Sequence, residues 1–116
     1  MKKNYLLAVL LFMLPYTSIA TEFQRSDVVI KRLHPLSSAR INDSGLASYT
    51  RIYVNNAPWG TSDCRDDAVD LHKDDTHLLS ILLTGWASGK VIHMLVEDSI
   101  PRVHSTVCRL VGFFVE

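Results

Sequence analysis

One segment alone in this chain has the periodicity of an amphipathic helix. In residues 74–90, DDTHLLSILLTGWASGK, apolar side chains recur at the spacing of one broad helical stripe: Leu78, Leu79, Leu82, Leu83 and Trp86. Asp74, Asp75 or Thr76 can cap the start of this helix. Gly89 suits its C-terminal end. A single helix has to bury its apolar stripe against a sheet, so the predicted fold class is mainly β with one helix, an α+β arrangement.

Five other segments are predicted to be extended. They are marked by β-branched and aromatic residues or by a two-residue alternation, and comprise residues 26–34, 47–55, 64–71, 91–98 and 106–116. The predicted order is therefore strand, strand, strand, helix, strand, strand. That is the plan of a small OB-fold-like barrel with one helix across one end. A helix packed on an antiparallel sheet is the alternative.

The N-terminus has the pattern of a secretory signal peptide. Lys2 and Lys3 precede an apolar run at residues 6–14, and the small-residue sequence Ser18-Ile19-Ala20 follows. Cleavage is predicted after Ala20, which leaves one domain of residues 21–116. The apolar run is shorter than the roughly 20 residues that span a bilayer, and no later run approaches that length. We therefore expect an exported protein, periplasmic or secreted, with no membrane span after cleavage.

In an exported protein the two cysteines are expected to have a structural role, because oxidising compartments favour disulfides. Cys64 and Cys108 are predicted to form one disulfide. Of the twelve basic residues in the whole chain, ten remain without Lys2 and Lys3, against twelve acidic residues. This slightly negative balance lacks the basic footprint of a nucleic-acid-binding protein.

The stretch CRDDAVDLHKDDTH, residues 64–77, can be interpreted in two ways. If it is extended, its even-numbered acidic and imidazole side chains project on one side, and a metal site could use Asp66, Asp70, His72 and Asp74. A zinc site from His72, Asp74 and His77 is a further possibility. The preferred interpretation is an edge strand, in which Val69 and Leu71 anchor the core while the charged set faces water. No cofactor and no metal is then expected.

No catalytic constellation is evident in the sequence. Ser80 and Ser88 lie in the predicted helix rather than in a G-x-S-x-G turn, and both cysteines are assigned to the disulfide. The aromatic residues are the better functional lead. Tyr49, Arg51 and Tyr53 alternate on one face of a predicted strand. Trp59 follows in a loop, and an exposed group of this kind suits stacking on sugars or anchoring a protein partner. The alternative is ordinary packing, with Trp59 closing one end of the predicted barrel.

Residues 64–115 resemble a recurrent group of small exported bacterial proteins. The shared order is a cysteine, a polar stretch, a helix of the type LLSILLTGWASGK, a strand of the type VIHMLVED and a second cysteine. The same half is distantly similar to B subunits of the subtilase-cytotoxin type, which have an OB-like fold and assemble as ring pentamers that bind cell-surface glycans. The acidic stretch before the helix departs from those subunits, and no sugar-pocket residue can be carried over.

These observations predict a non-catalytic exported binding domain, similar to a toxin B subunit. Its expected partner is a cell-surface glycan or an envelope protein, with homo-oligomer formation implied by the resemblance. A metal-binding protein or metal-dependent hydrolase built on the Asp and His stretch is one alternative. A structural or chaperone-like periplasmic protein is the other.

Overall fold

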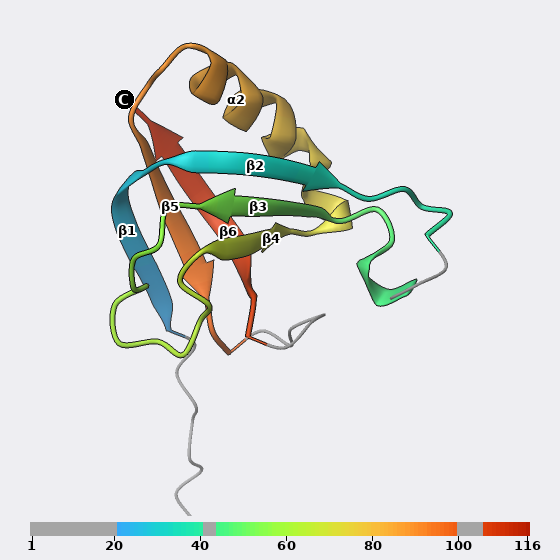
Figure 1. Cartoon of the computed structure of the whole chain (residues 1–116), viewed down its shortest axis with the longest axis horizontal. Helices are drawn as coiled ribbons and strands as arrows, with labels where there is room; N and C mark the ends of the chain where they lie inside the picture. Colours follow the sequence, from blue (N-terminus) through green and yellow to red (C-terminus); the bar gives the residue numbers. More distant parts are fainter. Residues whose placement is uncertain (1–20, 41–43, 100–105) are drawn as a thin grey trace, which may run out of the picture.

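The computed structural model describes residues 21–40, 44–99 and 106–116, so the predicted signal peptide at residues 1–20 lies outside it. One six-stranded sheet dominates the described residues, with one α-helix beside it (Figure 1). In chain order the elements are β1 (Glu22–Val28), β2 (Ile30–Pro35), the 3₁₀ turn η1 (Ser44–Leu46), β3 (Thr50–Val54), β4 (Ala68–Leu71), the 3₁₀ turn η2 (Lys73–Asp75), α2 (Thr76–Ala87), β5 (Ile92–Glu97) and β6 (Cys108–Val115). The predicted class, mainly β with one helix, is confirmed.

The strands of the sheet follow the order β1-β5-β6-β4-β3-β2. Neighbouring strands are antiparallel except β4 and β6, which pair in parallel over two residues of each strand. Only Val29 separates β1 from β2, yet these two strands lie at opposite ends of the order. The first extended segment therefore supplies the strand at each end of the sheet order, β1 at one end and β2 at the other (Figure 1).

The single strand predicted at residues 26–34 is instead two strands with a break between them. Asp27 has φ 55°, a left-handed conformation that interrupts a strand, and the β1–β5 register shifts between Arg25 and Val28. Val29 turns outward with 51% of its surface exposed. Asn55 holds this break, because its side-chain oxygen accepts from Val29 N–H at 2.9 Å and its own N–H donates to the Val29 carbonyl at 2.9 Å.

The prediction of an exposed edge strand before the helix is wrong. All four residues of β4 are buried, because β4 pairs with β3 on one side and with β6 on the other. The predicted core positions Val69 and Leu71 are confirmed, but Asp70 is also buried at 3% exposure. The predicted disulfide is present, with the Cα atoms of Cys64 and Cys108 5.4 Å apart. It ties the approach to β4 to the first residue of β6.

The helix packs on the sheet through a narrower face than predicted. Leu82 and Gly85 are buried, and Leu78 and Leu79 pack on the core, but Leu83 and Trp86 each leave 40% of their surface exposed. The interpretation of Trp86 as helix core is therefore wrong. None of the helices among the described residues is long and apolar enough to cross a membrane.

The two ends of α2 are held differently from one another. Asp75 occupies the N-cap position without a capping bond, because its carboxylate pairs with Arg109 at 2.9 Å. At the other end Gly89 N–H donates to Trp86 O, and Lys90 N–H donates to Gly85 O. This is a Schellman motif with Gly89 at φ 67°, as the sequence predicted for the C-terminal end.

Two glycines with positive φ provide a matched test of local packing. A Cβ on Gly60, φ 57°, would lie 2.8 Å from Phe23 Cδ1, whereas a Cβ on Gly89 would meet nothing within 4 Å. We expect Gly89→Ala to lower the free energy of unfolding by about 1 kcal/mol through backbone strain alone, and Gly60→Ala by about 2 kcal/mol. Urea denaturation measures both. Equal losses would show that Phe23 moves aside without cost.

Candidate binding site

Tyr53 on β3 is the half-buried aromatic residue of the predicted site, and its partner comes from β2. Arg32 and Tyr53 are directly opposite each other in the β2–β3 register. The guanidinium carbon of Arg32 lies 4.2 Å from the centroid of the Tyr53 ring. This is a cation–π contact on a half-exposed surface, which holds an arginine flat over an aromatic face.

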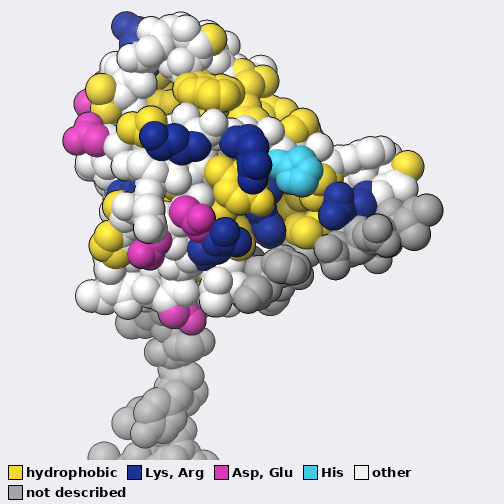
Figure 2. All heavy atoms as spheres, in the orientation of Figure 1, with side chains coloured by type: hydrophobic (Ala, Val, Ile, Leu, Met, Phe, Trp, Pro, Cys, Tyr) yellow, Lys and Arg dark blue, Asp and Glu magenta, His cyan; other side chains and the backbone are white. Residues whose placement is uncertain are grey.

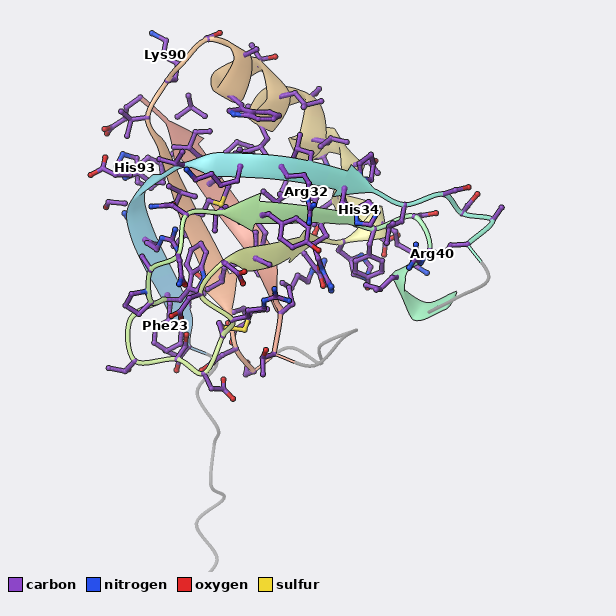
Figure 3. The ribbon with its side chains drawn as sticks, viewed as in Figure 1. Phe23, Arg32, His34, Arg40, Lys90 and His93 are labelled. Carbon is purple, nitrogen blue, oxygen red and sulfur yellow. A yellow bond between two sulfur atoms is a disulfide. The ribbon has the colours of Figure 1, made fainter. Side chains whose placement is uncertain are left out.

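A hollow lies beside this contact. Its volume is about 190 Å³, and it is lined by Arg32, Leu33, His34 and Tyr53. Figure 2 shows basic side chains and one histidine gathered around apolar side chains on the face that β2 and β3 present, and Figure 3 places Arg32 and His34 together there. The hollow is smaller than the roughly 300–1,000 Å³ of pockets for drug-sized ligands, so it suits one ring or side chain of a larger ligand.

Arg51 lies on the same strand as Tyr53 but is not available to a ligand. Its Nε and Nη2 atoms donate to the two carboxylate oxygens of Asp70 at 2.8 and 2.9 Å, across the β3–β4 pair. Both side chains are buried, at 9% and 4% exposure. The hydrogen bond to Asp70 raises the pKa of Arg51 despite its desolvation. The expectation that Arg51 belongs to an exposed face is wrong.

Tyr49 is also buried, at 7% exposure, although sequence alternation placed it on the face of Tyr53. Its ring meets the edge of the His72 ring at a centroid distance of 4.8 Å. Burial raises the pKa of the Tyr49 hydroxyl, and the nearby Arg109 opposes this rise. Tyr49 therefore packs below the surface and does not line the hollow.

Trp59 has no exposed surface, so the packing alternative for this loop residue is confirmed and Trp59 does not belong to an exposed group. Its indole N–H donates to the Arg65 carbonyl at 3.0 Å, and the Arg25 guanidinium lies 4.5 Å from its ring. Arg25 itself donates to main-chain oxygens of three residues, at 2.7 Å to Ala57, 2.9 Å to Asp66 and 2.5 Å to Asn55. We call this set of contacts the Arg25 clamp.

Desolvation in the Arg25 clamp lowers the pKa of Arg25, and the charge of Asp66 opposes the change. The Asn55 side-chain oxygen accepts a further bond from the same guanidinium at 2.6 Å. Carbonyl acceptors thus replace water around a cation with only 8% of its surface exposed. The clamp fixes the loop between β3 and β4 on the outer side of Trp59.

The acidic stretch does not gather the metal ligands considered from the sequence. Asp70 is occupied by Arg51, and His72 Nδ1 accepts from the Asp74 N–H at 3.1 Å. Across residues 21–40, 44–99 and 106–116, no cluster of three or more His, Cys, Asp or Glu side chains has an arrangement that could hold a metal ion. Two of the side chains considered for a metal, those of Asp70 and His72, instead hold neighbouring groups of the fold.

Sequence reasoning missed Arg32 and His34. Both lie in a segment that was predicted to be a strand, and their two-residue spacing puts them on one face. That signal was present, but their pairing with Tyr53 depends on the irregular β2–β3 register between Ile30 and Arg32. Only the structure brings these three side chains together.

No protein-family model, curated protein or solved structure matches this chain. Function therefore has to be argued from the geometry of the hollow and from the fold around it.

Proposed function

We propose that this protein is an exported, non-catalytic binding domain that recognises a cell-surface or envelope glycan through the hollow on β2 and β3. The observation that carries the proposal is the Arg32 guanidinium 4.2 Å above the Tyr53 ring, at the wall of the 190 Å³ hollow. An aromatic face accepts the apolar face of a sugar ring, while arginine and histidine offer donors to its hydroxyls. His34 provides the second polar wall.

The order of the strands supports an OB-fold-like barrel as the finer description of the fold. If β1 and β2 count as one broken strand, the sheet order becomes a closed circle of five strands in which the first meets both β3 and β5. The helix lies between β4 and β5, as the resemblance to toxin B subunits implies. OB folds commonly bind ligands on the face of their second and third strands, and Tyr53 of the hollow lies on β3, the second strand in this count.

Two further parts of the proposal have indirect support. The disulfide between Cys64 and Cys108 is compatible with export, because oxidising compartments preserve such bonds. Homo-oligomer formation is supported by Leu83 and Trp86, which expose apolar surface on α2. The hollow on β2 and β3 would remain open in an assembly formed through that flank of the helix.

The test begins with a glycan array and continues with calorimetry on the best ligand. We expect Tyr53→Ala to weaken binding about tenfold or more, because an aromatic anchor at the centre of a contact commonly contributes over about 1 kcal/mol. Tyr53→Phe should retain most affinity, since it keeps the ring under Arg32. Light scattering of the same samples gives the native mass.

Phe114→Ala is the matched control, because Phe114 is an exposed aromatic residue on β6 and not part of the hollow. It should leave glycan affinity unchanged. If Phe114→Ala and Tyr53→Ala bind equally well, the hollow is not the site. If the unaltered protein binds no glycan but retains an envelope protein in a pull-down, the ligand class proposed here is wrong.

A further inference from the structure

A second concave surface lies between the outer side of α2 and the end of β6. This groove has a volume of about 400 Å³ and is lined by Ser80, Ile81, Thr84, Gly85, Ser88, Lys90 and Val115. Its size falls within the roughly 300–1,000 Å³ of small-molecule sites. Gly85 allows the helix to approach the strand closely, since a Cβ there would lie 3.0 Å from Val115 Cγ2.

The groove is apolar although three of its residues carry hydroxyl groups. Thr84 Oγ1 donates to the Ser80 carbonyl at 2.8 Å, and Ser88 Oγ donates to the Thr84 carbonyl at 2.7 Å. The donor hydrogens of Thr84 and Ser88 are thus used within the helix and are not offered to a ligand, which leaves Ser80 as the one lining hydroxyl without such a bond among those described. Ile81 adds a side chain with 56% of its surface exposed. The wall therefore suits hydrocarbon.

Lys90 supplies the only formal charge in the lining of the groove. Its backbone is fixed, because its N–H donates to the Gly85 carbonyl in the Schellman motif. Among the residues that the structure describes, no acidic side chain forms an ion pair with Lys90. Figure 3 places Lys90 just beyond the C-terminal end of α2, well away from Arg32 and His34 on β2.

We propose that this groove binds a free single-chain anionic amphiphile, such as a fatty acid. The chain lies against Ile81, Gly85 and Val115, and the carboxylate pairs with Lys90. The charge complementarity comes from one cation at the end of an apolar channel. A membrane surface is the poorer occupant, because lipid-binding surfaces typically gather about 4–8 basic residues whereas this groove has one. The inference is independent of the proposed glycan site.

Calorimetry with decanoate, below its micellar concentration, tests the proposal on the full mature chain. Decyltrimethylammonium, which has the same chain length and the opposite charge, is the matched ligand. We expect decanoate to bind with one-to-one stoichiometry and the ammonium compound to bind at least about tenfold more weakly. Equal binding of the two compounds, or binding of neither, would overturn the proposal.

Variants of Lys90 test how much its charge contributes to decanoate binding, separately from the apolar wall of the groove. Lys90→Gln is expected to weaken decanoate binding about two- to fivefold, the range for one ion pair at an exposed site, while Lys90→Arg should restore it. Lys73→Gln is the control, because Lys73 is exposed and precedes the other end of α2. Equal affinities of the Lys90→Gln and Lys73→Gln proteins would exclude Lys90 as the anchor.

Ser80→Trp tests the cavity itself, since an indole on the outer side of α2 should fill the groove and abolish decanoate binding. The melting temperature of that variant shows whether it folds, and the Lys90 variants decide the question if it does not. Tyr53→Ala should bind decanoate normally. Loss of decanoate binding in Tyr53→Ala would contradict the assignment to this groove.

Discussion

Asp70→Ala should lower the free energy of unfolding by about 3–5 kcal/mol, the largest effect expected for a single side chain in this protein. The substitution leaves the Arg51 guanidinium buried, at 8% exposure, without the carboxylate that accepts its two hydrogen bonds. Removing one partner of a buried ion pair typically has this cost, because an uncompensated charge remains in a poorly solvated site. Chemical denaturation monitored by tryptophan fluorescence measures the loss.

A second ion pair in the same region is the control. Arg65 and Asp67 also form a side-chain pair, but both remain more than 40% exposed. Asp67→Ala should therefore change stability by no more than about 1 kcal/mol. The double variant Arg51→Met with Asp70→Leu should recover most of the loss, since an apolar pair of similar volume removes the buried charge. Similar losses for Asp67→Ala and Asp70→Ala would contradict the assigned burial.

Removal of the disulfide should lower the free energy of unfolding by about 4 kcal/mol. Cys64 and Cys108 are 44 residues apart, and closing a loop of that length restricts the unfolded chain by about this amount in the chain-entropy model. Parallel pairing between β4 and β6 extends over only two residues of each strand. The bond thus reinforces the shortest pairing in the sheet.

The Cys64→Ala, Cys108→Ala double variant and the reduced natural protein should show the same loss in denaturant titrations. Both half-cystines are buried, at 4% and 0% exposure, so reduction should be slow until the protein unfolds. Rapid reduction under native conditions, or a loss below about 1 kcal/mol, would show that the loop between them is already restrained in the unfolded chain.

The helix and the disulfide could be predicted from sequence because the evidence for each is simple. The periodicity of residues 78–86 and the glycine at position 89 depend only on neighbouring residues. The prediction of the disulfide needed only two cysteines and the expectation of export. The break at Asp27 could not be predicted in this way, because the hydrogen bonds beside it join Val29 to Asn55, which is distant in sequence.

The candidate site was harder to predict, because exposure depends on which strands become neighbours. Alternation correctly separated Tyr53 from Ile52, but it could not show that β4 would place Asp70 beside Arg51 and bury both. For Trp59, beside Pro58 and Gly60, the local sequence left exposure and packing as alternatives. The structure buries it in the core, with the Arg25 guanidinium, 34 residues earlier in the chain, above its ring.

The Arg25 clamp makes the loop between β3 and β4 tolerant of side-chain replacement. At Ala57 and Asp66 the clamp binds the main-chain carbonyl, an atom that every amino acid supplies. Changes of side chain at these two positions therefore leave both acceptors in place, whereas Asn55 contributes its own side-chain oxygen. Positions 57 and 66 can therefore diversify in sequence while the loop keeps its shape, which makes them natural positions for acquiring new specificity. Trp59, Gly60 and Cys64 in the same loop are instead restricted by burial, close packing and the disulfide.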